Sequence, residues 1–125
     1  MSHTTALKAV EMRNAEILLA AAKKLNIEHL GHKEYTLYDG SKHTGHGFQL
    51  KDYRYPVIID TETGIAACDT FNGSWGRQEE MDKFVQEYAA ESNRRQALEQ
   101  GYLVQEEYLE NGDLIQSFET MAAGY

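Results

Sequence analysis

Histidine is the residue type whose spacing in this sequence most clearly suggests chemistry. Two pairs, each with two residues between its members, occur close together: His29 with His32, and His43 with His46. Imidazole nitrogens are common ligands of zinc and other borderline metals, and two pairs on facing strands or loops can build a tetrahedral site. The spacing therefore raises the hypothesis of a metal-binding protein, with zinc as the cofactor and these four histidines as its ligands.

Two features of the sequence argue against that zinc site. Structural zinc sites usually include thiolates, and Cys68 is the only cysteine in the chain. Residues three apart on a regular strand point to opposite faces of the sheet, which would separate His29 from His32. Gly45 and Gly47 would let the backbone bend around an ion, but the competing interpretation is a set of surface histidines around a loop.

Paired carboxylates offer a different chemistry. Asp60 and Asp69 fall on the two strands of a predicted hairpin, where they could face each other and share a proton as an acid/base pair. A small enzyme that combines this pair with a histidine is therefore an alternative. Against it, the chain holds 20 acidic residues, so close pairs are expected by chance. No serine or cysteine lies in a recognised nucleophile motif.

Aromatic residues are dense between positions 35 and 75, and this density suggests a binding surface. Aromatic rings on a sheet can stack the bases of single-stranded nucleic acid, but they are also ordinary strand and core residues. Tyr, Trp and Arg together are the composition of a protein interface. We therefore predict a protein-binding site that includes Tyr53, Tyr55, Trp75 and Arg77.

The net charge limits the kind of partner. The sequence has 20 Asp and Glu against 12 Lys and Arg, which gives a formal charge of −8. A protein that binds the phosphate backbone presents a basic face, so this balance argues against nucleic acid and leaves open a basic protein partner. No run of about 18 apolar residues is present, so no membrane span is expected. The lone Cys68 cannot form an intrachain disulfide, and a cytoplasmic location is the expectation.

The elements that must position these residues are indicated by the pattern of apolar side chains. The clearest is a long helix over 77–100, with Glu87 among the residues expected to face water. Its apolar face repeats at three- and four-residue steps, through Met81, Phe84, Val85, Tyr88, Ala89 and Ser92. Gly101 can take the positive φ that ends a helix. A β-hairpin should follow, because Asn111-Gly112 separates two alternating segments, 103–110 and 113–119.

The first half of the chain predicts a second helix and several strands. Asn14 can cap a helix over 15–25, and Asn72 or Ser74 can cap the long one. Strands are expected over 3–10, 27–30, 35–38, a segment from Phe48 to Tyr53 or Tyr55, and a hairpin of 57–60 with 65–69. We therefore predict a single α+β domain over residues 1–125, an antiparallel sheet of about five to seven strands with two helices packed on one face.

The two ends of the sequence resemble a known family, the hypothetical chloroplast reading frame thirty-five proteins, which occur in algal plastids, cyanobacteria and some bacteriophages. The matching residues are Met1-Ser2-His3, then Phe84, Tyr88, Ala97, Gln100-Gly101-Tyr102, Val104, Glu106, Glu107 and Asn111-Gly112. The family is described as of unknown function. The resemblance therefore implies a fold class and a distribution, without a substrate or catalytic residues.

These patterns together predict a non-enzymatic protein-interaction or regulatory accessory module that binds another protein. The basis is the acidic composition, the aromatic candidates and the lack of an assembled catalytic constellation. If the chain is encoded by a bacteriophage, as the resemblance allows, the partner would be a host protein. An exposed edge strand would also allow a homodimer. The metal-binding protein and the small acid/base enzyme are the two alternatives.

Overall fold

The structure, a computed structural model, describes residues 4–7, 11–69 and 76–120. The elements are β1 (Thr4–Leu7), α1 (Ala15–Lys24), β2 (Glu28–Thr36), β3 (Lys42–Gln49), β4 (Val57–Asp60), β5 (Ile65–Asp69), α2 (Gln78–Gln100), β6 (Tyr102–Tyr108) and β7 (Leu114–Thr120). All strand pairs are antiparallel. They form a five-stranded sheet of order β1-β5-β4-β3-β2 and a separate sheet of β6 with β7. The predicted α+β class is confirmed, although the strands divide between two sheets.

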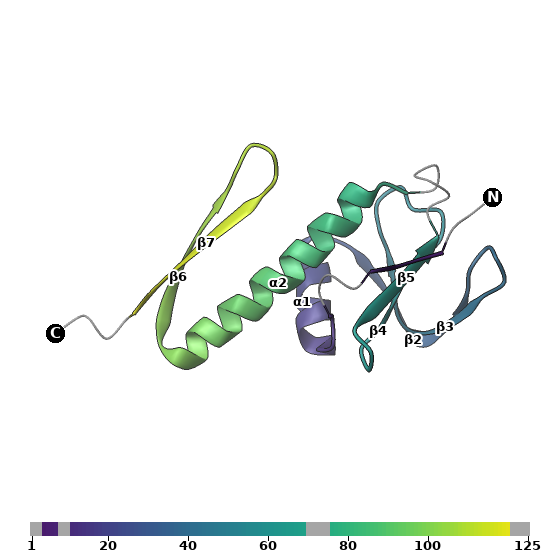
Figure 1. The fold of residues 1–125 in the computed structure, drawn as a ribbon, viewed down its shortest axis with the longest axis horizontal. Coiled ribbons are helices and arrows are strands. Elements are labelled where there is room, and N and C mark those ends of the chain that lie inside the picture. Colours follow the sequence, from purple (N-terminus) through teal and green to yellow (C-terminus); the bar gives the residue numbers. More distant parts are fainter. Residues whose placement is uncertain (1–3, 8–10, 70–75, 121–125) are drawn as a thin grey trace.

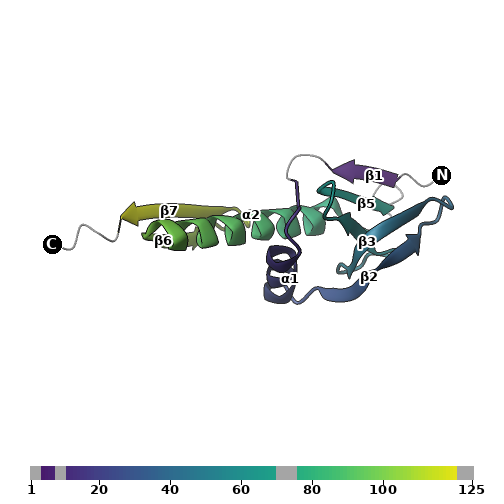
Figure 2. The ribbon, with the colours of Figure 1, turned by 90° about the horizontal axis from the view of Figure 1, so that it is seen from below.

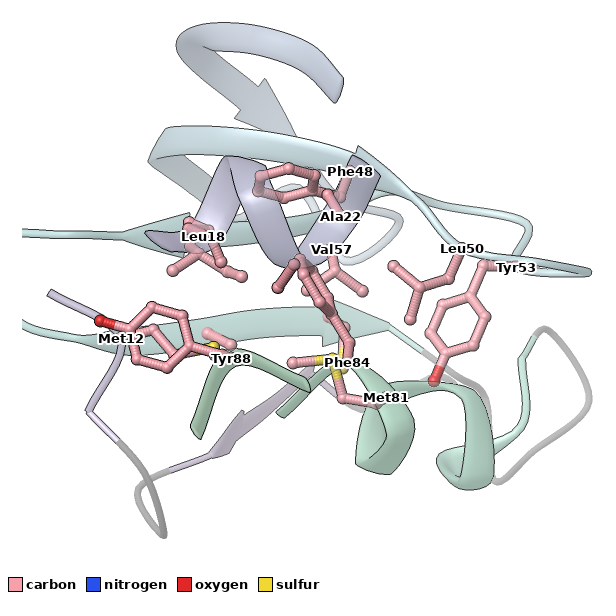
Figure 3. Close-up of a cluster of buried hydrophobic side chains, with 14 of the residues drawn as sticks. Met12, Leu18, Ala22, Phe48, Leu50, Tyr53, Val57, Met81, Phe84 and Tyr88 are labelled. Atoms are coloured by element: carbon pink, nitrogen blue, oxygen red, sulfur yellow. The ribbon is translucent and has the colours of Figure 1, made fainter. Parts of the chain in front are cut away.

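Both helices pack on one face of the five-stranded sheet, as the sequence predicted. The core between these layers is shown in Figure 3, where Leu18 and Ala22 of α1 and Met81 of α2 meet Val57 of the sheet. At its centre the rings of Phe48 and Phe84 pack edge to face, with centroids 5.1 Å apart. Burying each side chain of this size stabilises the fold by about 1.5–3 kcal/mol. This core holds the sheet and the first half of α2 together.

The start of α1 is fixed by its cap and by α2. The side-chain oxygen of Asn14 accepts a hydrogen bond from the Ile17 amide at 3.1 Å, as predicted for an N-cap. The Asn14 amide donates in turn to the Tyr88 hydroxyl at 3.0 Å. The hydroxyl of this otherwise buried tyrosine therefore ties α1 to α2 at the edge of the core.

The second half of α2 continues past the five-stranded sheet, and the β6–β7 hairpin lies along it (Figures 1 and 2). We call the described residues up to Tyr88 the body, and residues 89–120 the arm. Within the described chain, every member of the main core lies in the body. Gly101 ends α2 in the left-handed conformation with φ +77°, and the hairpin turns at Gly112 with φ +92°. Both glycine positions were predicted.

Three local expectations are corrected. The segments 27–30 and 35–38 do not form two strands, because β2 runs without a break from Glu28 to Thr36. Tyr53 and Tyr55 lie outside any strand. The N-cap of α2 is Arg77, which makes no side-chain capping bond, while Asn72 and Ser74 lie outside the described residues.

None of the helices in the described part of the chain combines the length and the apolar character needed to cross a membrane.

Candidate binding surface

The structure brings three of the four predicted histidines together, through an irregularity in β2. The pairing of β2 with β3 shifts register between His29 and Gly31, where Gly31 has φ +106°. His29 is paired with Phe48 and His32 with His46. Because Phe48 and His46 are two residues apart on β3, their side chains share a face. The shift therefore places His29 and His32 on one face, against the expectation for a regular strand.

The three rings form a contact cluster. His29 Nε2 and His46 Nδ1 are 3.1 Å apart, and the centroids of the His32 and His46 rings are 4.8 Å apart. Burial, and then the nearby charges of His32 and His29, lower the pKa of His46. His43 lies elsewhere, opposite Tyr35, with its Nε2 2.9 Å from the hydroxyl of Ser41. The four predicted ligands therefore do not converge on one point.

Metal binding by these histidines stays a prediction. Among the described residues, no group of three or more His, Cys, Asp or Glu side chains is placed to hold a metal ion. The flanking Gly47 has a packing role, because a Cβ there would lie 2.3 Å from Cζ of Tyr35. The Tyr35 hydroxyl donates to the carbonyl of Gly31 at 2.6 Å. Gly47 therefore leaves space for the ring of Tyr35 from the neighbouring strand, and this packing explains the glycine without a bend around an ion.

Of the predicted carboxylate pair, Asp60 and Asp69, the structure describes the side chain of Asp60. Asp60 is half-buried, and its Oδ1 accepts a hydrogen bond from the Glu62 amide at 2.9 Å, within the turn that joins β4 and β5. It also borders a shallow groove of about 260 Å³ that His43 lines. The side chain of Asp69 lies outside the described residues. The acid/base hypothesis therefore stays a prediction. The carboxylate of Asp60 stabilises the turn between β4 and β5.

The three predicted binding residues that the structure describes, Tyr53, Tyr55 and Arg77, differ in exposure. Tyr53 is 5% exposed, so its ring belongs to the core, and its hydroxyl donates to the Arg77 carbonyl at 2.7 Å. Burial, followed by the nearby Cys68 and acidic side chains, raises the pKa of Tyr53. Tyr55 is half-buried, Arg77 is exposed at the start of α2, and Trp75 lies outside the described residues. Tyr53 is therefore corrected from a contact residue to a core residue.

The arm carries the apolar surface that sequence reasoning placed elsewhere. Eight large hydrophobic side chains are exposed among the described residues, and two of them, Leu19 and Tyr38, are in the body. The other six are in the arm: Leu98, Leu103, Tyr108, Leu109, Ile115 and Phe118. Leu98 is the most exposed of all, at 74%. A concentration of this kind is typical of a surface that contacts another molecule.

The arm is also where the negative charge collects. From Gln96 to the end of the sequence there are six acidic residues and no Lys or Arg, so this segment carries −6 of the −8. The preceding 95 residues have 14 acidic and 12 basic residues, a charge of −2. The acidic character noted from the composition is therefore a property of the C-terminal segment. Together with the exposed side chains, it makes the arm both apolar and anionic.

The hairpin is held against α2 by charged side chains. Glu87, 2% exposed, receives hydrogen bonds from Arg94 at 2.7 Å and from the Tyr108 hydroxyl at 3.0 Å. Arg94 also binds Glu91 at 3.0 Å and Glu106 at 2.6 Å. Partial burial would lower the pKa of Arg94, but its hydrogen bonds to Glu106, Glu87 and Glu91 raise it overall. Buried charges are tolerated when they are paired in this way.

Amide side chains complete the attachment on the β7 side. Gln86 donates to the Gly112 carbonyl at 3.1 Å and accepts from the Leu114 amide at 3.3 Å. Gln116 donates to the Ala90 carbonyl at 3.2 Å and accepts from Asn93 at 3.0 Å. No residue of β6 or β7 is buried. Polar contacts, rather than an apolar core, therefore fix the hairpin in place.

Comparison of the chain with protein families, with characterised proteins and with solved structures gave no match. The resemblance to the chloroplast reading frame family therefore stays a prediction.

Proposed function

We propose that this protein is a non-enzymatic protein-binding module and that its arm is the docking surface. The observation that carries the proposal is that six of the eight exposed large hydrophobic side chains lie on the arm. Covering such side chains with a partner removes apolar area from water, at about 25 cal/mol for each Å². The body has already buried its apolar residues, so it gains less from a partner.

The hairpin supports this proposal because it has only two strands and only one of its faces packs on α2. A two-stranded hairpin in water is at best marginally stable, and three strands or a packed face are needed for independent stability. On β6, the side chains of Glu106 and Tyr108 reach α2. Alternation along the strands then turns Leu103 and Ile115 to the opposite face, where both are about half exposed. A partner on that face would supply the second packed layer.

The charge of the arm indicates what the partner should look like. From Gln96 on, the arm has six acidic residues and no basic one, so its surface is complementary to an apolar surface rimmed by Lys and Arg. A second copy of the same arm would bring like charges together, which costs free energy and slows association. The proposal is therefore a separate, basic protein, either an accessory protein or, for a phage gene, a host protein.

The test is affinity capture from a lysate of the source organism, with Leu103→Ser/Ile115→Ser beside the wild type. The matched control is Leu19→Ser/Tyr38→Ser, which removes the two exposed large hydrophobics of the body. We expect a stoichiometric partner that the arm variant loses by at least about tenfold in affinity and that the control keeps, since central apolar anchors dominate binding energy. A partner kept by the arm variant, or no stoichiometric partner, would count against the proposal.

A further inference from the structure

A groove lies between the last turns of α2 and the hairpin. Its volume is about 450 Å³, and it is lined by Asn93, Gln96, Ala97, Gln100, Tyr102 and Phe118. We infer that it binds an extended, basic segment of the partner protein, with one large apolar side chain of that segment seated in the groove. This inference rests on the proposed function and names the chemistry that the arm would recognise.

The groove is shaped for an apolar side chain. Ala97, which is 3% exposed, lies at the bottom of the groove, and its small side chain leaves space above it. Phe118 is 45% exposed and forms one side of the groove. Pockets that hold ligands are lined mainly by apolar and aromatic groups, with a few polar groups to fix orientation. Tyr102 adds a second ring to the lining. A Leu, Phe or Trp side chain would cover exposed ring surface that the chain itself leaves open.

The polar side of the groove suits a peptide backbone. Asn93, Gln96 and Gln100 are spaced by three and four residues, which places them along one face of α2. A carboxamide both donates and accepts, as the N–H and C=O groups of an extended segment require. Asn93 already donates to Gln116, but the side chains of Gln96 and Gln100 are exposed and make no hydrogen bond to another described residue. They remain available to a bound backbone.

The neighbouring strand and charges agree with this occupant. Within the described residues β7 pairs only with β6, so its other edge has unpaired backbone groups that an extended segment can meet. Glu99 precedes Gln100 on α2, and no Lys or Arg follows Arg95. Glu119 follows Phe118 but alternates to the face of the hairpin that carries Leu103, so it adds to the negative charge of the arm from the other side of β7. Charge therefore favours Lys or Arg beside the apolar anchor and disfavours a second acidic arm as the occupant.

The experiment measures fluorescence anisotropy of a short labelled peptide in which Arg and Thr alternate around a central Trp. Two comparison peptides carry Glu for Arg, or Gly for the Trp. We expect the first peptide to bind the full chain in a salt-sensitive way, and both substitutions to weaken binding by about tenfold or more. Equal binding of the Glu peptide, or no binding of the Arg–Trp peptide, would overturn the inference.

Variants of the protein locate the site. Glu99→Lys/Glu119→Lys and, separately, Ala97→Leu should each weaken the Arg–Trp peptide by about tenfold, one by charge and the other by filling the groove. Glu34→Lys, on β2 of the body, is the charge control and should leave binding unchanged. Circular dichroism of each variant checks that it folds. If Glu34→Lys weakens the peptide as much as the arm variants do, the groove is not the site.

Two outcomes keep this inference distinct from the proposed function. If no peptide binds while Leu103→Ser/Ile115→Ser still loses the captured partner, the arm docks a partner but the groove does not take a basic segment. If sedimentation shows a dimer of the free chain that Ala97→Leu dissolves, the occupant is a second copy, and the inferred basic segment is wrong.

Discussion

The body and the arm place their apolar side chains in opposite positions. In the body, rings such as Phe48 and Phe84 are fully buried between a sheet and two helices. In the arm, Arg94 and Gln116 occupy the interface between α2 and the hairpin together with Glu87 from the end of the body, while large apolar side chains face outward. The comparison indicates that the body buries its apolar side chains within the chain itself, whereas those of the arm would be buried only by a partner.

The two regions should also differ in stability. A hydrogen bond contributes about 0.5–1.5 kcal/mol net, because water competes for the same groups, whereas each buried ring contributes more through apolar burial. The hairpin depends on the first kind of contact and the sheet on the second. Proteins open locally where apolar burial is sparse. We therefore expect the arm to open before the body unfolds.

The largest expected effect comes from matched phenylalanine truncations in the two regions. Phe84→Ala removes a fully buried ring from the body and should lower the free energy of unfolding by about 3–5 kcal/mol, because it leaves a cavity beside Phe48. Phe118→Ala removes a ring that is 45% exposed in the arm and should cost about 1 kcal/mol or less. Urea denaturation of both variants measures the difference. Similar losses would mean that the arm is part of one continuous core.

A smaller effect, confined to the arm, is expected for Glu87→Gln. The carboxylate is 2% exposed and touches α1 through Lys24 at 3.7 Å, α2 through Arg94 and β6 through Tyr108. Removing one partner from a buried ion pair is costly, and since Arg94 keeps Glu91 and Glu106, we expect local destabilisation of about 2 kcal/mol. Hydrogen exchange should become faster in β6 and β7.

The control for that variant is Glu79→Gln, an exposed carboxylate in the first turn of α2. It should change exchange in neither region. Amides of β3 and β4 report on the body and should keep their protection when Glu87 is replaced. If they lose protection together with the hairpin, Glu87 stabilises the whole chain and the two regions are one cooperative unit.

The helices could largely be predicted, because the signals for a helix face and for helix ends are local or periodic in the sequence. The step of three and four residues identified the face with Met81, Phe84 and Tyr88, and Asn14 and Gly101 marked helix ends by cap chemistry. The irregularity at Gly31 could not be seen in the same way. A single glycine such as Gly31 is as typical of a turn between two strands as of an irregularity within one strand. Only the pairing with β3 shows that the strand continues.

The candidate site was missed for a related reason. α2 has a second stripe, at Glu87, Ala90, Arg94 and Ala97, that follows helical spacing as faithfully as the first. Two of its members are charged, so a search for apolar periodicity assigns Glu87 to solvent. Alternation in the hairpin shows that Leu103 and Ile115 share a face, but it does not say which face meets a helix. The signal that was available is the absence of Lys and Arg after Arg95.

The smallest expected effect is a pH dependence that separates the arm from the body. The hydrogen bond from Arg94 is the main cause that lowers the pKa of Glu106 below its usual value of 4.5. Because the folded chain holds this carboxylate ionised more firmly than the unfolded chain does, its contribution to stability is complete above pH 4.5 and is lost as the pH falls through the lowered pKa. NMR shifts of β6 and β7 should therefore move toward unfolded values in acid.

Two neighbouring glutamates make this a matched comparison. Glu106→Gln should weaken the hairpin slightly at neutral pH and remove part of its acid sensitivity, although Glu91, whose pKa is also lowered, leaves some of it in place. Glu107 is exposed and alternates to the other face of β6, opposite Ile115, so Glu107→Gln should leave the acid transition of the hairpin as it is in the wild type. If both variants flatten the transition equally, the general negative charge of the arm governs its stability, and the Arg94 contact does not. In that case a basic partner would stabilise the hairpin through charge alone, without the specific packing that distinguishes the body.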